Sequence, residues 1–262
     1  MKKETHNQYS ILGCGWLGKP LAKKLIQKGV HVKGSTTSSH KLEDLRDIGI
    51  DAYLLNIDQL TEDIQPFLEA GLLIIALPSK NISGFETLIS HIEQSVVKKV
   101  IFISSTSVYD DSQENVNEES KIKQCPLADI ERLFDTNIHF KTTIIRFAGL
   151  LGYDRKPGRW FSTGAKIPNP EGVVNMIHQD DCIEIILQII EKNIWGETFN
   201  ACADSHPSRR DFYTQAKIEL GLDPPSFTES DIYKSKRVSN TKLKSYLDFS
   251  FKYPDLMNIE EK

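Results

Sequence analysis

Three glycines near the start of the chain have the spacing of a loop that holds phosphate groups. Gly13, Cys14, Gly15, Trp16, Leu17 and Gly18 read G-x-G-x-x-G and follow a short apolar run at residues 9–12. The first glycine of such a loop allows a tight turn, the second lets the backbone approach a pyrophosphate, and the third lets helix and strand pack closely. The amides that open the following helix face the phosphates. These six residues predict a nicotinamide dinucleotide site.

A second motif overlaps this loop. Residues 13–19 also satisfy G-x-x-x-x-G-K, the first part of the loop used by ATP- and GTP-hydrolysing proteins. The next residue is Pro20, which has no hydroxyl for Mg²⁺, so nucleotide triphosphate hydrolysis is disfavoured.

The end of the next strand bears on the ribose. Sites for NAD usually carry Asp or Glu about twenty residues after the glycines, to bind the 2′-hydroxyl. Residues 32–40 contain no acid and offer instead a run of hydroxyls, with Lys33 and Lys41 nearby: Ser35, Thr36, Thr37 and Ser38. Hydroxyls and a cation suit a 2′-phosphate, which favours NADP, with NAD as the alternative. The alternative is that these hydroxyls bind no ligand and belong to a turn in which a Ser or Thr caps the next helix.

The elements alternate in type, as they do in a parallel sheet covered by helices. The apolar run at residues 71–77 predicts a strand buried on both faces at the sheet centre. Residues at the carboxyl ends of such strands bind ligands, so we add Asp58, Ala76, Leu77, Pro78 and Ser104 to the cofactor site. Strands are expected at 9–12, 30–34, 51–57, 71–77, 100–104, 141–147, 173–177 and 198–201, and helices at 16–27, 39–48, 82–97, 181–191 and 209–220.

The predicted fold class is α/β, a Rossmann doubly wound parallel sheet with a small C-terminal region that caps the substrate. The dinucleotide-binding domain is expected at 8–148 and 172–202, and the cap at 149–171 and 203–262. Residues 110–124 predict a polar loop of unusual length, which is typical of functional or mobile segments.

Four stretches in order resemble extended, or atypical, short-chain dehydrogenases/reductases of the NAD-dependent epimerase/dehydratase family. They are the glycine loop, ISSTSVY at 103–109, IRFAGLLG at 145–152 and NMIHQDD at 175–181. The resemblance implies that Ser105 is catalytic, with a hydroxyl that bonds the substrate oxygen whose charge changes during hydride transfer. A capping or turn serine is the alternative.

The chain departs from the family at its proton-transfer pair. Relatives use Tyr-x-x-x-Lys, whereas the corresponding helix, PLADIERLF at 126–134, has neither residue, although Glu131 matches a family glutamate. The literal match at 213–217 lies after the sheet is complete, and we interpret it as chance. Substitutes are Tyr109, His178, Tyr153 and Asp129, of which we assign Tyr109 and His178 as catalytic. Both types of residue are also common as packed, structural side chains.

Three further residues are assigned to substrate. Arg146 resembles the arginine of the family's R-x-x-x-x-Y-G-P-G, and Asp181 ends a match to its H-x-x-D. Arg159, like Arg155, lies in an irregular basic segment and could bind a carboxylate or phosphate. Asp180 and Asp181 would also serve as helix N-caps.

Bulk composition narrows the function classes. A net charge of −4 with both signs interspersed gives no case for nucleic acid or a membrane surface. The four cysteines form no C-x-x-C pair, which argues against zinc and disulfides, and no metal is expected. The first eight residues are polar and no apolar run could span a bilayer, so a cytoplasmic monomer or homodimer acting on a small molecule is expected.

Two functions follow from this pattern. The first is an NAD(P)-dependent oxidoreductase or epimerase acting on a small polar, sugar-like metabolite. The alternative is a non-catalytic, NADP-binding or redox-sensing protein that has lost the Tyr-x-x-x-Lys pair. We favour the enzyme.

Overall fold

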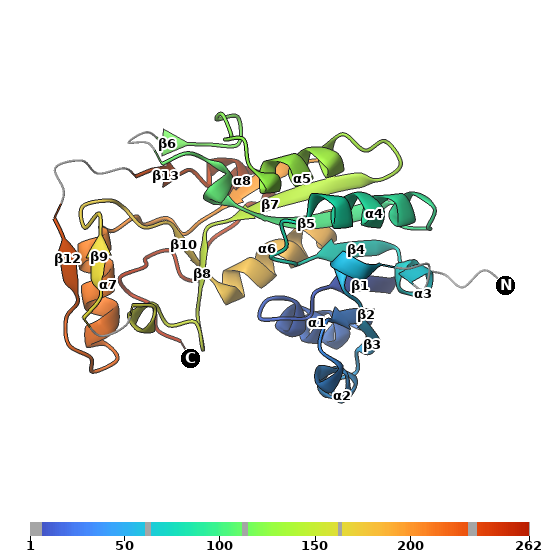
Figure 1. Cartoon of the computed structure of the whole chain (residues 1–262), viewed down its shortest axis with the longest axis horizontal. Coiled ribbons are helices and arrows are strands. Elements are labelled where there is room, and N and C mark those ends of the chain that lie inside the picture. Colours follow the sequence, from blue (N-terminus) through green and yellow to red (C-terminus); the bar gives the residue numbers. More distant parts are fainter. Residues whose placement is uncertain (1–6, 61–63, 112–114, 162–163, 230–234, 262) are drawn as a thin grey trace. The chain divides into compact units, whose positions relative to one another are not determined.

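A computed structural model describes residues 7–60, 64–111, 115–161, 164–229 and 235–261 (Figure 1). Contacts divide the chain into two compact units. The first comprises residues 1–104, 124–145 and 193–198, and the second comprises 105–123, 146–192 and 199–262. The sequence placed 172–192 in the dinucleotide-binding domain, whereas these contacts group it with the second unit; the functional boundary of the cap stays a prediction. Expectations for residues 1–6, and for parts of the 110–124, 149–171 and 203–262 segments, lie outside the described residues.

A seven-stranded sheet in the order β11-β7-β5-β4-β1-β2-β3 forms the frame of the first unit. The expectation of a Rossmann-type parallel sheet is confirmed, and β4, the apolar strand, is its central member. The unit boundary runs through the ends of β5, β7 and β11. The strands are β1 Gln8–Leu12, β2 His31–Thr36, β3 Asp51–Leu54, β4 Leu72–Ile75, β5 Lys99–Ser105, β7 Lys141–Phe147 and β11 Thr198–Ala201.

Helices cover this sheet, and α4 and α5 pack side by side on one face of it (Figure 1). Phe85 of α4, Phe102 of β5 and Phe134 of α5 are fully or almost fully buried and contact one another, with ring centroids 4.9–5.9 Å apart. Buried aromatic groups of this kind contribute strongly to a core. The helices are α1 Gly18–Gln27, α2 Leu42–Arg46, α3 Gln65–Leu68, α4 Ile82–Glu93 and α5 Pro126–Asp135.

Several predicted elements are shorter in the structure: the helix expected at 82–97 ends at Glu93, and the strand expected at 71–77 is Leu72–Ile75. Two others differ for local reasons. The helix expected at 39–48 is a 3₁₀ turn at Ser39–Lys41 followed by α2. The strand expected at 51–57 ends at Leu54, and the side chain of Asn56 then accepts a hydrogen bond from the Asp58 amide. Asn side chains that bond the backbone two residues on compete with strand pairing, which explains the early end.

The second unit has its own core and three two-stranded parallel ladders. The ladders are β8 Gly149–Leu151 with β10 Met176–His178, β9 Lys166–Pro168 with β12 Ser226–Thr228, and β6 Asn115–Val116 with β13 Arg237–Val238. Its helices are α6 Gln179–Glu191, α7 Arg209–Ile218 and α8 Thr241–Leu247. The strand predicted at 173–177 thus lies a few residues later, as β10, and the segment predicted as a long loop contains β6.

None of the helices in the described part of the chain has the length and apolarity needed to cross a membrane.

Candidate functional site

The three glycines of the loop meet three different environments. A Cβ on Gly18 would stand 2.2 Å from the Gly13 carbonyl oxygen, and one on Gly13, where φ is +104°, would stand 2.7 Å from that of Ala76. Neither position has room for a side chain. A Cβ on Gly15 would meet nothing within 4 Å. Gly13 and Gly18 are therefore required by packing, whereas Gly15 keeps an open place next to the backbone.

Ser35 fixes this loop from the neighbouring strand. The Gly13 amide donates a hydrogen bond to Ser35 Oγ at 2.9 Å, and the Cys14 amide donates to the Ser35 carbonyl at 2.7 Å. Ser35 is only 1% exposed. Among the four hydroxyls that the sequence assigned to the ribose, Ser35 thus acts on the loop, and its oxygen is already engaged there.

The start of α1 suits an anion. Its first turn contains no acidic residue, and the N-cap residue, Leu17, supplies no side-chain hydrogen bond to the helix amides. A helix start of this kind keeps the partial positive charge of its amides available. Together with the open place at Gly15, these residues fit the diphosphate of a dinucleotide.

The hydroxyls and lysines predicted to bind the ribose have different contacts in the structure. Thr36 Oγ1 accepts a hydrogen bond from the Ser38 amide at 3.2 Å. Ser38 is the N-cap of the 3₁₀ turn, but its side chain makes no capping bond. Lys33 is directed elsewhere, because its ammonium donates to the carbonyls of Pro66 and Glu69. Of the two lysines that the sequence named, Lys41 is the exposed one, at the end of that turn.

The other predicted cofactor residues follow β3 and β4. Asp58 accepts a hydrogen bond at 2.5 Å from Asn81, which caps α4 through the Gly84 amide. Ala76 and Leu77 are half-buried and approach Gly13, while Pro78 is exposed. Ala76 and Leu77 are thereby brought together with the glycine loop.

Ser104 does not face an open site. It is 6% exposed and donates a hydrogen bond to the carboxylate of Glu131, which is 3% exposed. This bond ties the end of β5 to α5, the helix that has no Tyr or Lys. The match of Glu131 to a family glutamate thus has a structural explanation. Ser104 is its partner, and the assignment of Ser104 to the cofactor stays a prediction.

Ser105 caps a short helical turn in the second unit. Its Oγ accepts a hydrogen bond from the Ser107 amide at 3.1 Å, as the N-cap of the 3₁₀ turn Thr106–Val108. The side chain is half-buried, and its hydroxyl proton remains for another acceptor. Capping and a bond to substrate are compatible at this residue, so the catalytic assignment stays a prediction.

Tyr109 and Arg146 form the centre of a buried polar network. Arg146 donates to the Tyr109 hydroxyl at 2.7 Å, and that hydroxyl donates to Asn200 at 2.9 Å. The backbone N–H of Asn200 donates a hydrogen bond to the carboxylate of Glu118. Burial raises the pKa of Tyr109, although Arg146 opposes that shift. Tyr109 is 0% exposed and its hydroxyl bonds both Arg146 and Asn200, so both side chains have structural contacts here, and their catalytic and substrate assignments stay predictions.

The H-x-x-D segment starts α6, with a different cap from the one predicted. The N-cap is His178, whose Nδ1 accepts from the Asp180 amide at 3.1 Å, so the expectation that Asp180 or Asp181 caps the helix is wrong. The ring is 0% exposed and lies 4.0 Å from the Tyr253 ring, centroid to centroid. Asp181 accepts from the amides of Lys252 and Tyr253 at 2.7 and 3.1 Å.

The residues predicted to bind substrate or to replace the Tyr-x-x-x-Lys pair differ in exposure. Arg155, Arg159 and Tyr153 are exposed, whereas Arg146, His178 and Asp181 are buried. Asp129 pairs with Arg132 at 2.7 Å on the outside of α5. The sequence analysis missed three residues that contact the predicted site residues. Asn200 and Glu118 belong to the buried network around Tyr109, and Glu261 contacts Tyr153 and His178. No motif or periodicity singles these three residues out. Within the described ranges, no group of three or more metal-ligating residues could hold an ion.

A family model matches the N-terminal half of the chain, and a curated relative matches nearly all of it. Residues 8–130 match a family model described as the NAD binding domain of 6-phosphogluconate dehydrogenase. Protein YeeZ of Escherichia coli strain K12 is 35% identical over 266 residues, which span 94% of this chain and 96% of YeeZ.

Two solved structures show the same fold. A putative NAD-dependent epimerase/dehydratase from Methylobacillus flagellatus has a TM-score of 0.76 and 22% identity, over 95% of this chain and 94% of its own. UDP-glucuronic acid 4-epimerase from Bacillus cereus, in complex with NAD, has a TM-score of 0.77 and 18% identity, over 95% of each chain. The resemblance predicted from the four stretches is thus confirmed for the fold, and the family model confirms a domain for a nicotinamide dinucleotide.

Proposed function

Since the chain belongs to the same family as YeeZ and has the fold of the NAD-dependent epimerases and dehydratases, we propose that it is an NADP-preferring oxidoreductase or epimerase. Its substrate is a small polar, sugar-like metabolite, and the protein acts in the cytoplasm as a monomer or homodimer. One observation carries the proposal: Gly15 leaves open space beside a helix start that has no acidic residue.

The first unit supplies the binding of the cofactor. The amides at the start of α1 take the diphosphate, with Trp16, Leu17 and Gly18 at the turn and Gly15 giving the space. Thr37, Ser38 and Lys41 take the 2′-phosphate, because the strand end before them has no carboxylate to repel it. Thr36 holds the Ser38 amide and so shapes this turn.

The second unit supplies the groups for the substrate. A bound nicotinamide contributes hydride transfer to or from carbon. Ser105 donates its free hydroxyl proton in a hydrogen bond to the substrate oxygen whose charge changes. Arg159 and Arg155, both exposed, provide cations for an anionic part of the substrate. Arg146 and Tyr109 act through the buried network that positions the segment after Ser105.

Titration of the purified protein with NADPH and with NADH, followed by fluorescence, tests the cofactor. NADPH is expected to bind about ten times more tightly than NADH, a difference of about 1.4 kcal/mol. Replacing Lys41 with Ala should remove most of that difference by weakening NADPH alone, since it removes one cation from the 2′-phosphate.

Lys28, a basic residue just after α1, provides a matched control. Lys28→Ala is expected to leave both affinities unchanged. Equal affinity for the two nucleotides in the unmodified protein would refute the assignment of residues 37–41, while failure to bind either would refute the whole function.

A second function is favoured by one observation. Helix α5 has no Tyr-x-x-x-Lys pair, and the two residues assigned as substitutes, Tyr109 and His178, are each 0% exposed. A protein that binds NADP for redox sensing would need neither. A panel of carbonyl compounds and sugar nucleotides, monitored for cofactor oxidation or reduction, separates the two. Turnover that Ser105→Ala lowers by about tenfold or more supports the enzyme, and tight binding without turnover supports the sensor.

A further inference from the structure

The carboxylate of Glu261 contacts three groups from two segments of the second unit, the turn at residues 152–156 and the start of α6. Its Oε1 accepts a hydrogen bond from the Tyr153 amide and lies 3.4 Å from His178 Nε2. Its Oε2 lies 3.9 Å from Lys156 Nζ. Because His178 Nδ1 accepts from the Asp180 amide, the neutral ring carries its proton on Nε2 and donates it to Glu261. Together these groups form a receptor for one carboxylate.

The backbone around Tyr153 is shaped for this contact. Gly152 and Arg155 exchange two backbone hydrogen bonds, at 3.2 and 3.0 Å, which close a tight turn. Tyr153 has φ of +53° in that turn, a conformation that costs energy for a residue with a Cβ. The side chain of Tyr153 donates to Asp180 at 2.8 Å, which fixes the turn from the other side.

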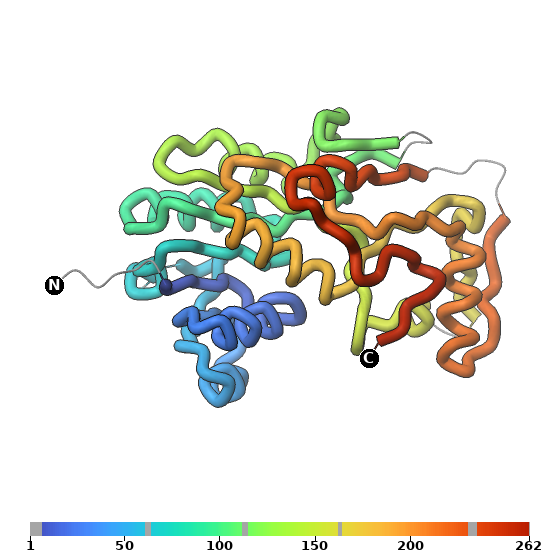
Figure 2. The backbone as a smooth tube through the Cα atoms, turned by 180° about the vertical axis from the view of Figure 1, so that it is seen from behind, coloured from blue at the N-terminus to red at the C-terminus, as the bar shows by residue number. Residues whose placement is uncertain are grey.

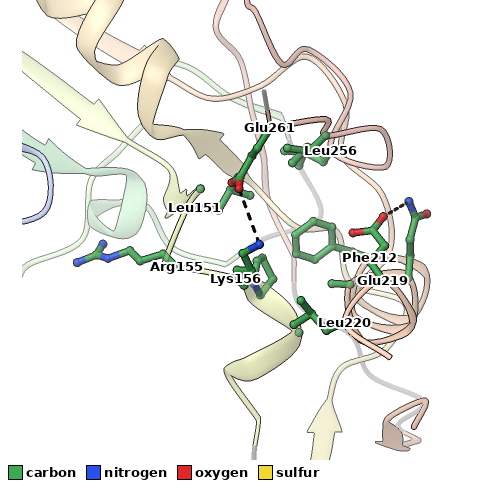
Figure 3. Close-up of a pocket in the computed structure, with 14 residues that line it drawn as sticks. Leu151, Arg155, Lys156, Phe212, Glu219, Leu220, Leu256 and Glu261 are labelled. Carbon is green, nitrogen blue, oxygen red and sulfur yellow. Dashed lines mark hydrogen bonds and ion pairs between the residues drawn. The ribbon is translucent and has the colours of Figure 1, made fainter. Parts of the chain in front are cut away.

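A cavity of about 300 Å³ adjoins the same carboxylate. Figure 3 shows Glu261 and Lys156 directed toward one another at one side, with Phe212 close by. Figure 2 shows the C-terminal part of the chain, in red, running to its end beside the yellow-green segment near residue 150. The rest of the wall is mixed. Apolar side chains come from Leu151, Phe212, Leu220, Leu256 and Ile259, and polar ones from Arg155, Gln215 and Glu219, of which Gln215 donates a hydrogen bond to Glu219.

We propose that this cavity binds a small carboxylic acid with an apolar body, whose carboxylate replaces that of Glu261 in the receptor. The apolar body then lies against Leu151, Phe212 and Leu220. The site is formed wholly by the second unit. It shares Arg155 with the groups proposed for the substrate, but none of its lining residues belongs to the glycine loop, so the proposal goes beyond dinucleotide binding.

The chemistry of the receptor selects the ligand. A backbone N–H, a ring N–H and an ammonium group all donate, so they recognise an anionic acceptor rather than an amine. In the exchange one carboxylate takes the place of another, so the charge that faces Lys156 is unchanged. A cavity of about 300 Å³ is at the lower end of the range for small-molecule sites, which favours a short chain.

Glu261 competes with that ligand because it belongs to the same chain. A tethered group has an effective concentration in the millimolar range, so the unmodified protein should bind a free monocarboxylate weakly. Glu261→Gln removes the competing charge and leaves the receptor in place. Hexanoate, followed by isothermal titration calorimetry, should then bind about tenfold more tightly than it binds the unmodified protein.

Matched variants and probes make this result specific. Glu260→Gln removes an equal charge from the adjacent exposed residue and should leave hexanoate affinity unchanged. Lys156→Gln, added to Glu261→Gln, should weaken hexanoate by about tenfold, whereas Lys166→Gln should not. Hexan-1-ol, which has the same chain without the charge, should bind at least about tenfold more weakly.

The proposal is overturned if folded Glu261→Gln binds hexanoate no better than the unmodified protein, or binds hexanol equally well. Should Glu261→Gln not fold, the unmodified protein still provides a test. Hexanoate should raise its melting temperature above that in equal sodium chloride, and Lys156→Gln should abolish the rise; no rise overturns the proposal. NADPH titration of the same variants should be unchanged, which separates failure here from failure of the dinucleotide function.

Discussion

At Gly15 the backbone runs beside open space, while four residues of neighbouring backbone and side chain fill the places that Gly13 and Gly18 leave: Ile11, Gly13, Ala76 and Leu77. The same residue type thus serves ligand access at one position and close packing at two others. Cys14, between the first two glycines, is buried, and burial raises the pKa of its thiol to about 12, so the thiol stays protonated at neutral pH.

Substitutions at Gly15 and Gly18 should therefore have opposite effects. Gly15→Val is expected to fold with an unchanged melting temperature but to bind NADPH about a hundredfold more weakly, a loss of about 2.8 kcal/mol, since the side chain occupies the diphosphate position. Gly18→Ala should lower the free energy of unfolding by about 1–3 kcal/mol through overpacking. Thermal melts and NADPH titration check both, and a Gly15→Val protein that binds normally would contradict the site.

At the scale of elements, the first turn of α6 joins the segment after α8 to the rest of the second unit. Asp181 accepts from the amides of Lys252 and Tyr253, and Asp180 accepts from Lys252 Nζ at 2.7 Å. Burial would raise the pKa of Asp180, but the bonds from Lys252 and Tyr153 outweigh it, so that pKa is lowered. The bond to Asp180 raises the pKa of Tyr153 to about 12, so this exposed tyrosine stays protonated at neutral pH.

Asp181→Asn tests whether this residue acts structurally. The new amide group would face one of the two backbone N–H donors, and an unsatisfied buried donor costs about 1–3 kcal/mol. We expect urea denaturation to show a loss of that size with NADPH affinity unchanged. Asp223→Asn, at an exposed position, should have no effect on either. A stable Asp181→Asn protein that loses turnover alone would instead favour the substrate role.

At the scale of the whole molecule, buried thiols make stability depend on alkaline pH. Cys14, Cys182 and Cys202 are buried, and Cys125 is partly exposed. Burial raises the pKa of Cys14 and of Cys202 to about 12, and that of Cys182 well above its usual value. Below pH 9, the ordinary thiol value, the stability from these neutral thiols is complete; it is lost as pH rises toward the folded-state values.

Urea denaturation at several pH values between 8 and 11 measures this loss, which should approach about 1.4 kcal/mol per pH unit for each buried thiol. Cys202→Ala should reduce the slope and Cys125→Ser should leave it unchanged. A thiol reagent at pH 8 should modify Cys125 alone in the folded protein and all four cysteines after unfolding. Rapid reaction at more than one cysteine of the folded protein would contradict the burial of the other three.

The sequence by itself determined the strands of the large sheet, most of the helices, the order of these types and the dinucleotide loop, but not the short paired strands of the second unit. Apolar periodicity, glycine spacing and the unbroken apolar character of β4 are local properties, since they depend on residues within one turn or one strand. These local properties predicted the central strand of the sheet and the dinucleotide domain. The absence of the Tyr-x-x-x-Lys pair was read directly from residues 126–134. The capping role of Ser105, given as the alternative to catalysis, could also be predicted from neighbouring residues alone.

Only the tertiary structure decided which side chains meet, because such pairs join residues that are far apart in sequence. Ser35 holds Gly13 from 22 residues away, Asn200 meets Glu118 across 82, and Glu261 reaches Tyr153 across 108. Periodicity carries no information on such pairs; they form when separate elements are packed to bury apolar surface. That packing withdrew Ser35, Ser104, Tyr109 and His178 into structural contacts, and it brought a carboxylate to the receptor around Tyr153.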